Sequence, residues 1–269
     1  MVVSRKLLVV AGCAVAAAAV AALGVQLYLM GVFRLAYPDS HEFPVRGIDV
    51  SHHQRDIDWQ KLSRQNIRFA YIKASEGGAW RDPLFAKNVA AARAAGVAVG
   101  GYHYFSMCVP GWIQAQNFIR ATLPAQSLSL PPAIDLEYLG NCGARPTPQA
   151  FARELDVFVG TMRARFGVSP VLYTTQSFYD AYLHNAEFAP HPLWVRNLFG
   201  DMSWAFGRTV LFRQFANKAR LDGIDGPVDL DTFQGSQAQF AALVVSVTCP
   251  AKRKHCRAIT KPWSAPRAP

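Results

Sequence analysis

The sequence lacks the cysteine and histidine spacings that mark common metal sites. Its five cysteines form no CxxC pair and its seven histidines form no HxxxH pair, which disfavours a zinc site. A metal role for the adjacent His52 and His53 is disfavoured as well. No internal repeat or low-complexity block occurs between residues 45 and 247. With 51% hydrophobic residues, most of the chain can bury a core, which excludes a largely disordered protein.

Acidic residues are missing from both ends of the chain. Three of the 28 lysines and arginines precede residue 35 and six follow residue 250, whereas all 18 acidic residues lie between. The net charge of +10 therefore belongs to the ends, and the body is nearly neutral. Without a recognition motif, such a body does not support nucleic-acid binding. The basic tail over 248–269 could contact anionic lipid or an anionic wall polymer, or be a solvated end.

Charged residues are also absent from a 27-residue run over 7–33, which follows Arg5 and Lys6 and precedes Arg34. A bilayer core needs about 20 apolar residues, whereas the apolar part of a cleavable signal peptide has roughly 7 to 15. The run therefore favours an uncleaved signal anchor over a cleaved signal peptide. Because basic residues stay cytoplasmic, everything after Arg34 should lie outside the membrane. We expect a cell-envelope protein, held in the inner membrane with its domain periplasmic or extracellular, or secreted if the segment is cleaved.

Four cysteines follow the apolar run, and Cys13 lies within it. In an oxidising compartment the four allow two disulfides with three possible pairings. We favour Cys108 with Cys142, which follow consecutive predicted strands, and Cys249 with Cys256, which would close a short C-terminal loop.

Short β-rich runs alternate with helical patterns along the body of the chain. Strands are expected over 45–51, 68–75, 98–105, 132–138, 170–175, 192–198, 209–216 and 227–233. Helical patterns lie between the first five, over 56–66, 82–96, 111–123 and 147–167. After residue 190 the strands leave little room for helices. The pattern predicts one parallel-rich α/β barrel over 35–247 that loses its helices near the end, preceded by an anchor over 1–34.

Helix boundaries carry their usual signals. Asp56 is expected to cap the first helix, Asp82 with Pro83 to begin the second, and Thr147 with Pro148 to begin the fourth. The second and fourth helices should end at Gly96 and Gly167.

The stretch PPAIDLEY, residues 131–138, places two acids two positions apart in an apolar run. Alternate strand residues share a side, so Asp135 and Glu137 should face one cavity, with one protonated near neutral pH and its neighbour ionised. Acids also end or occupy three other strands: Asp49, Glu76, Asp229 and Asp231. Each alone could be a cap or a surface group. Because catalytic residues of such barrels gather at the carboxyl ends of the strands, we expect these acids to converge there.

Aromatic residues fall on the same strands. Sugar rings stack on aromatic faces, so the candidate substrate-binding residues are Tyr71, Tyr102, Tyr104, Tyr138, Tyr173 and Trp194, with Glu76 and Gln214 as polar partners. Packing in the core is the alternative for each ring.

These segments together resemble the family 25 glycoside hydrolases, the Chalaropsis-type lysozymes that cut bacterial peptidoglycan. The resemblance covers roughly residues 45–235 and is carried by the segments GIDVSHHQRDIDW, FAYIKASEG, DPLFAKNVAAARAAGVAVGGYHYF, AQNFI, PPAIDLE, PVLYTTQSF, PLWV and GIDGPVDLDTF.

The resemblance implies an irregular TIM-like (β/α)5β3 barrel that needs no metal or organic cofactor. It also implies catalytic roles for four acids. Glu137 would be the general acid, Asp135 its partner carboxylate, and Asp49 and Asp229 the acidic floor. The substrate would be a peptidoglycan glycan strand, cut between N-acetylmuramic acid and N-acetylglucosamine. Two mechanisms stay open: retention assisted by the N-acetyl group of the sugar, and inversion by an activated water.

Two positions depart from the family pattern. Arg213-Gln214-Phe215 stands where members often carry W-Q-Y, and Arg196 stands where a small residue is common. These changes could reshape a sugar subsite or add an anion contact. Two other functions therefore remain alternatives: hydrolysis of another exported polysaccharide, and non-catalytic glycan binding on the same barrel.

Overall fold

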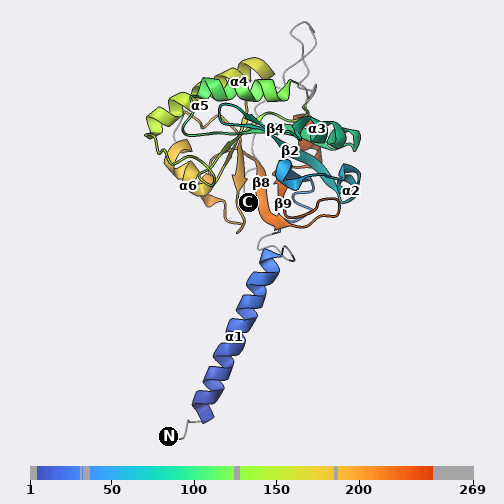
Figure 1. The fold of residues 1–269 in the computed structure, drawn as a ribbon, viewed down its shortest axis with the longest axis vertical. Coiled ribbons are helices and arrows are strands. Elements are labelled where there is room, and N and C mark those ends of the chain that lie inside the picture. Colours follow the sequence, from blue (N-terminus) through green and yellow to red (C-terminus); the bar gives the residue numbers. More distant parts are fainter. Residues whose placement is uncertain (1–4, 31, 33–36, 124–127, 185–186, 245–269) are drawn as a thin grey trace.

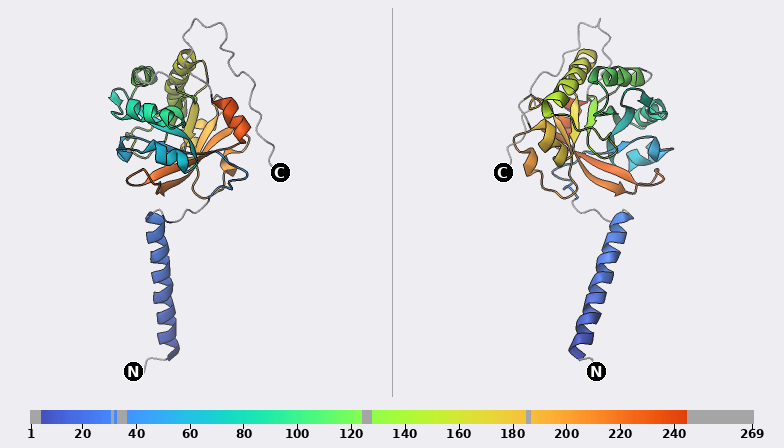
Figure 2. Two further views of the ribbon diagram at one scale, coloured as in Figure 1. Left: turned by 90° about the vertical axis from the view of Figure 1, so that its right-hand side faces the viewer. Right: turned by 60° about the vertical axis from the view of Figure 1, so that its left-hand side comes forward.

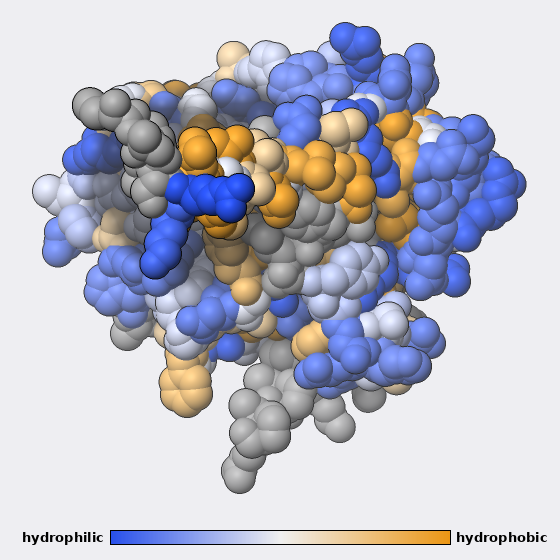
Figure 3. Space-filling view, turned by 90° about the horizontal axis from the view of Figure 1, so that it is seen from below, coloured by the Kyte–Doolittle hydropathy of each residue, from blue (hydrophilic) through white to orange (hydrophobic). Residues whose placement is uncertain are grey.

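The computed structural model describes residues 5–30, 32, 37–123, 128–184 and 187–244, which form a rounded domain and one long projecting helix (Figure 1). That helix, α1, spans Arg5–Leu29. It contains a 21-residue segment, Leu8–Tyr28, that is long and apolar enough to cross a membrane. The view from below shows a band of apolar side chains against a mostly hydrophilic surface (Figure 3).

The domain is a closed barrel. Among the described residues there are nine strands, and eight of them close in the order β1-β2-β4-β5-β6-β7-β8-β9 and back to β1. Neighbouring strands are parallel from β1 to β8, and β9 runs antiparallel to both β8 and β1. The ninth, β3, is a short hairpin partner of β2 outside the closed barrel.

The strands are β1 (Arg46–Val50), β2 (Ile67–Glu76), β3 (Trp80–Arg81), β4 (Ala98–Tyr104), β5 (Ala133–Leu136), β6 (Val171–Thr174), β7 (Leu193–Arg196), β8 (Val210–Ala219) and β9 (Val228–Phe233). The α-helices of the domain are α2 (Trp59–Arg64), α3 (Phe85–Ala94), α4 (Gly111–Thr122), α5 (Pro148–Phe166), α6 (Gln176–Phe178) and α7 (Gln237–Leu243). Shorter helical turns are η1 (His52–Gln54), η2 (Tyr179–Leu183) and η3 (Ser203–Ala205).

The predicted (β/α)5β3 barrel is confirmed. Each of the eight strand-like runs contains one barrel strand, and helices α2 to α6 follow the first five barrel strands in turn. From β7 onward the strands are joined by loops and the single turn η3. The hairpin strand β3, the α6–η2 segment and the final helix α7 carry no signal that the sequence analysis used.

Two of the predicted helix starts are wrong by two residues. Asp58, and not Asp56, caps α2 by accepting a hydrogen bond from the backbone N–H of Lys61 (3.0 Å). The helix α3 begins after Leu84. The Asp82 carboxylate accepts a hydrogen bond from the Leu84 backbone N–H (2.9 Å), and this bond stabilises a turn that comes before the helix. The Thr147 cap, Pro148 at the first position and the left-handed Gly167 at the end of α5 are as predicted.

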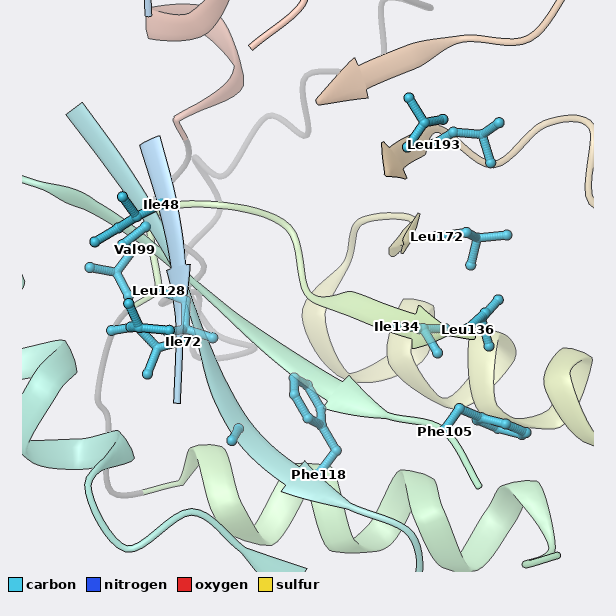
Figure 4. Close-up of a cluster of buried hydrophobic side chains, with 14 of the residues drawn as sticks. Ile48, Ile72, Val99, Phe105, Phe118, Leu128, Ile134, Leu136, Leu172 and Leu193 are labelled. Carbon is cyan, nitrogen blue, oxygen red and sulfur yellow. The ribbon is translucent and has the colours of Figure 1, made fainter. Parts of the chain in front are cut away.

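Two apolar layers hold the barrel together. The larger lies between the strands and the surrounding helices and contains Ile48, Ile72, Ile134 and Phe118 of α4 (Figure 4). The smaller fills the barrel interior, where Phe69 packs against Phe212, Phe240 of α7 and other rings. Because α7 contributes Phe240 to this interior cluster, it closes one end of the barrel and leaves the chemistry to the other.

The wall formed by β8, β9 and β1 lies on the side that faces α1 (Figures 1 and 2). Tyr37 contacts Phe215 of β8 edge to face (5.1 Å between ring centroids), and the Arg46 guanidinium lies 4.8 Å from the Tyr37 centroid. The Tyr28 hydroxyl lies 3.5 Å from Asn217 Oδ1. Tyr28 of α1 and Tyr37 are therefore both in contact with β8 of this wall.

One disulfide joins the loops after β4 and β5. Cys108 and Cys142 are bonded, with their Cα atoms 6.2 Å apart, so this predicted pairing is confirmed. The pairing of Cys249 with Cys256 lies outside the described residues, as does the basic tail.

Candidate active site

The predicted acids gather at one end of the barrel interior. Asp49 lies on β1, Asp135 on β5, and Glu137 one residue beyond β5. The antiparallel strand β9 brings Asp229 level with Asp49 in the strand register and places Asp231 one inward position deeper. Sequence alternation could predict this convergence, because each acid is on the inward face of its strand.

An amide group holds two of these acids at a fixed position. The Gln214 Nε2 group donates to Asp49 Oδ2 (2.8 Å) and to Asp229 Oδ2 (3.1 Å). The amide orientation is set in turn by the Tyr173 hydroxyl, which donates to Gln214 Oε1 (3.1 Å). Four barrel strands, β1, β6, β8 and β9, thus share one hydrogen-bonded network in the floor of the site, and Gln214 and Tyr173 serve as its support.

Beneath this network lies a layer of buried rings. The Trp194 Nε1 group donates to Asp231 Oδ1 (2.8 Å), and the Tyr71 ring stacks on Trp194 (4.8 Å between centroids). Tyr71 is 0% and Trp194 2% exposed. Neither ring can reach a sugar through the layer above it, so both are supports for the acids rather than the stacking surfaces predicted from the sequence.

The central pair, Asp135 and Glu137, lies against the opposite wall. Asp135 is 9% exposed, and its Oδ1 atom has no hydrogen-bond partner among the described residues. Glu137 is half-buried. The loop that carries Glu137 is tied down by Asn141, whose amide donates to the carbonyls of Glu137 (3.0 Å) and Phe105 (2.8 Å). The Cys108–Cys142 disulfide joins the same two loops.

Two cations lie near the acids. Lys73 Nζ is 2.7 Å from Glu76 Oε2 and lies 5.2 Å and 4.9 Å from the ring centroids of Trp80 and Tyr104. Arg196 ends β7, two residues after the inward-facing Trp194. The sequence analysis missed Lys73 and Trp80, although Lys73 stands two residues after Tyr71 and strand alternation alone could have found it.

Burial raises the pKa of five carboxyls in the site, and repulsion between them adds to the rise for all of these except Asp49. Burial raises the pKa of Glu137 to about 7, against the opposing charge of Arg196, and raises that of Asp49 to about 6. Burial and the neighbouring Glu137 hold the pKa of Asp135 well above its usual range. Burial and the charge of Asp49 likewise hold the pKa values of Asp229 and Asp231 well above their usual range.

The contrast between a protonated acid and an ionised neighbour stays a prediction for this pair. The pKa values of Asp135 and Glu137 are both raised, because burial disfavours a charge on either group. A cluster with this many buried carboxyls and two nearby cations holds protons at neutral pH, which is what a proton donor requires.

The remaining predicted residues divide into two groups. Tyr102 is nearly buried, and the carboxyls of Asp49 and Asp135 raise its pKa further after burial itself, so its hydroxyl lies near the acids. The Tyr104 hydroxyl donates to the Leu139 carbonyl (2.8 Å) at the rim. Tyr138 points away from the acids and packs on Phe178 of α6, 4.9 Å between centroids.

The histidines at the rim do not form part of a metal-binding cluster. His52 Nδ1 lies 3.2 Å from Asp82 Oδ2, and its ring lies 5.1 Å from Trp80. Across the described segments of the chain, no group of three or more histidine, cysteine or acidic side chains has the geometry to hold a metal ion.

A closed α/β barrel with a proton-holding acid cluster at its open end defines the class of this protein, a glycoside hydrolase. The model of the glycosyl hydrolases family 25 matches residues 48–224, and the chain belongs to this family. The resemblance read from the sequence is thereby confirmed.

Individual relatives agree with this assignment. The chain is 31% identical over 217 residues to the uncharacterised protein YegX of Escherichia coli, covering 79% of this chain and 77% of that one. It is 31% identical over 215 residues to lysozyme M1 of Streptomyces globisporus, covering 74% and 71%. The solved structure of a family 25 glycosyl hydrolase from Bacillus anthracis superposes with a TM-score of 0.71 at 32% identity, covering 79% and 98%.

Proposed function

We propose that this chain cleaves the β-1,4 bond between N-acetylmuramic acid and N-acetylglucosamine in bacterial peptidoglycan. The family and the similarity to a protein named lysozyme support this substrate. The observation that carries the proposal is Glu137, a half-buried carboxyl with a pKa of about 7 beside the buried Asp135 at the barrel opening.

Glu137 is the proton donor in this proposal. A carboxyl with a pKa near 7 is about half protonated in neutral solution, and the protonated form can give its proton to the leaving glycosidic oxygen. As the bond breaks, positive charge develops on the sugar ring, and it is stabilised by the carboxylate that Glu137 becomes on giving up its proton and by ionised neighbours. Asp135 is the nearest partner, and Asp49 and Asp229 supply the rest of this negative environment from the opposite wall.

The substrate contacts follow from exposure. Tyr71 and Trp194 are excluded by their burial, and the half-buried Tyr138 packs on Phe178. Among the rings near the acids, Trp80 is 38% exposed and β3 places it next to Glu76, whereas Tyr104 is 7% exposed. An exposed indole beside an acid cluster offers an apolar face to a sugar ring.

The assignment of Glu137 is tested by replacing it with glutamine in the full-length protein. Glu137→Gln keeps the shape of the side chain but cannot donate a proton, so release of soluble fragments from peptidoglycan should fall at least about 100-fold. Glu187→Gln, an exposed glutamate before β7, makes the same change outside the site and should retain the wild-type rate. Full activity in a folded Glu137→Gln protein would remove Glu137 from the mechanism.

We also propose that α1 anchors the chain in the membrane, with residues 35–247 forming the enzyme domain outside the cytoplasm and 248–269 a basic tail. The apolar side chains of α1 are exposed, including Val15 at 70% and Leu23 at 58%, and such a surface is stable in lipid but not in water. Arg5 and Lys6 precede the span, as expected of a cytoplasmic end. The Cys108–Cys142 disulfide suits an oxidising compartment.

A further inference from the structure

Lys73 and Arg196, the two cations near the acids, differ in whether their side chains have partners within the protein. Lys73 is engaged on several sides, by Glu76 and by the rings of Trp80 and Tyr104. The side chain of Arg196, by contrast, makes no hydrogen bond or ion pair with any residue that the structure describes. A half-buried guanidinium carries several N–H donors and a full charge, and at a binding site these groups are available to a ligand.

The position of Arg196 places it in the site and not beside it. Its strand-register partner is Gln214, the residue whose amide binds Asp49 and Asp229. Its charge acts on Glu137 more strongly than that of any other single side chain, and it opposes the rise of the Glu137 pKa. It also favours the ionised forms of Asp49 and Asp229.

The neighbouring carboxyls do not neutralise Arg196. Asp49 and Asp229 are held by the Gln214 amide, and no acid lies within 4 Å of the guanidinium among the described residues. Burial also raises the pKa of these acids, which reduces the negative charge that they offer. Arg196 therefore keeps its capacity for a planar, two-pronged contact with an external carboxylate.

We propose that the Arg196 guanidinium binds a carboxylate of the substrate and makes the enzyme selective for negatively charged glycan. This inference rests on the proposed cleavage of peptidoglycan. N-acetylmuramic acid differs from N-acetylglucosamine by a lactyl group. Its carboxyl is free in strands stripped of peptide, and it is amide-linked in intact strands to a stem peptide that has carboxylates of its own. Both sources present the same chemistry to Arg196.

The resemblance to the family places a small residue at this position more often than an arginine. A small residue leaves the acids of the site without this opposing charge, whereas Arg196 adds a site for an anion at their edge.

The test measures kcat/KM of the full-length protein on four substrates: peptide-free and peptide-bearing glycan strands, each before and after conversion of its carboxyls to methylamides. Removal of the carboxylate should reduce wild-type kcat/KM roughly 10-fold or more, mainly through KM, because a charged hydrogen bond is lost. In Arg196→Gln the same conversion should change kcat/KM by less than about 2-fold. The substitution and the amidation each remove the same contact, between Arg196 and the substrate carboxylate, so the second change has little left to remove. Arg153→Gln, on the exposed face of α5, removes an equal charge elsewhere and should behave as wild type.

The type of glycan strand on which amidation lowers wild-type kcat/KM shows which carboxylate Arg196 binds. A loss confined to peptide-free strands assigns the contact to the lactyl carboxylate, and a loss confined to peptide-bearing strands assigns it to the stem. The inference is overturned if amidation costs Arg196→Gln as much as it costs the wild type, because Arg196 would then act only on the catalytic acids. It is also overturned if amidation costs the wild type nothing. A folded wild-type protein that cleaves none of the strands contradicts the proposed function itself.

Discussion

At the scale of single residues, the site is a set of carboxyls whose protonation is controlled by burial. Its central acid, Glu137, has a pKa raised to about 7, so the fraction of enzyme with a proton to donate decreases as the pH rises past that value. We predict that kcat/KM falls about 10-fold for each pH unit above the Glu137 pKa. A pH-rate profile on purified peptidoglycan measures this, and a rate that stays constant from pH 6 to 9 would contradict it.

The charge of Arg196 should set the pH at which kcat/KM begins to fall, the basic limb of the pH-rate profile. Its charge lowers the pKa of Glu137, so its removal lets the pKa rise. We predict that the limb moves to higher pH in Arg196→Gln and stays in place in Arg153→Gln, measured on amidated strands, where the proposed substrate contact is absent. A limb at the same pH in both variants would separate Arg196 from the proton donor.

The same acids should reduce stability at neutral pH. A carboxyl whose pKa is raised by folding contributes stability that is fully present below its unfolded pKa, near 4, and is lost as the pH rises through the folded value. Asp229 is such a group. We predict that Asp229→Asn, which removes the titration, raises Tm at pH 8 by at least about 2 °C while the difference shrinks toward pH 4. Thermal unfolding at the two pH values measures it, and equal differences at both would contradict the linkage.

Strand alternation was sufficient to predict which acids share the barrel interior. It could not predict how deep each inward residue lies, because depth depends on strand register and on the antiparallel direction of β9. For this reason Tyr71 and Trp194, predicted to contact sugar, are buried below the acids. Tyr138 follows Glu137 directly, so alternation places it on the opposite face from the acids, where its ring packs on Phe178 of α6.

At the scale of elements, the site depends on how α4 and α5 pack, because the loops before these helices carry Cys108 and Glu137. Gly111 begins α4, and its N–H donates to Glu154 Oε2 (2.7 Å). A Cβ atom at this position would lie 1.9 Å from the Glu154 carbonyl oxygen on α5. The two helices can approach this closely only when residue 111 has no side chain.

We therefore predict that Gly111→Ala destabilises the protein by about 1–3 kcal/mol, because the helices must move apart. Gly160→Ala is the matched control on α5, where an added Cβ meets nothing within 4 Å. It should leave stability unchanged or raise it by up to about 1 kcal/mol. Denaturant unfolding of both variants tests the pair, and equal effects would show that the contact has no energetic role.

The elements themselves were largely predictable. Every barrel strand has a β-rich run in the sequence, and Thr147, Pro148 and Gly167 mark α5 at both ends. The helix start near Asp82 was misplaced because this aspartate caps a preceding turn. The start near Asp56 was misplaced because its side chain pairs with Lys87, and Asp58 caps the helix instead. The two-residue strand β3 is too short for any pattern to indicate it.

At the scale of the whole molecule, the barrel wall of β8, β9 and β1 faces the apolar helix α1 (Figure 2). Tyr28 and Tyr37 both contact β8, through Asn217 and Phe215. If α1 crosses the membrane, this wall lies closest to the lipid surface.

We predict that the full-length protein sediments with membranes, and that external protease digests its barrel domain in cells whose cytoplasmic proteins stay protected. Val15→Asp places a charge in the middle of the span and should reduce membrane association, because insertion of a charged residue costs about 3 kcal/mol. A soluble, shortened wild-type product would show that the segment is cleaved and would contradict the anchor.

The most direct test of the central claim identifies the bond that is cut. Purified full-length protein is incubated with peptidoglycan, and the new reducing ends are identified by mass spectrometry, with Glu137→Gln as the inactive control. We predict new reducing ends at N-acetylmuramic acid that are absent from the Glu137→Gln digest. New ends at N-acetylglucosamine, or no new ends from a folded wild-type protein, would contradict the assignment.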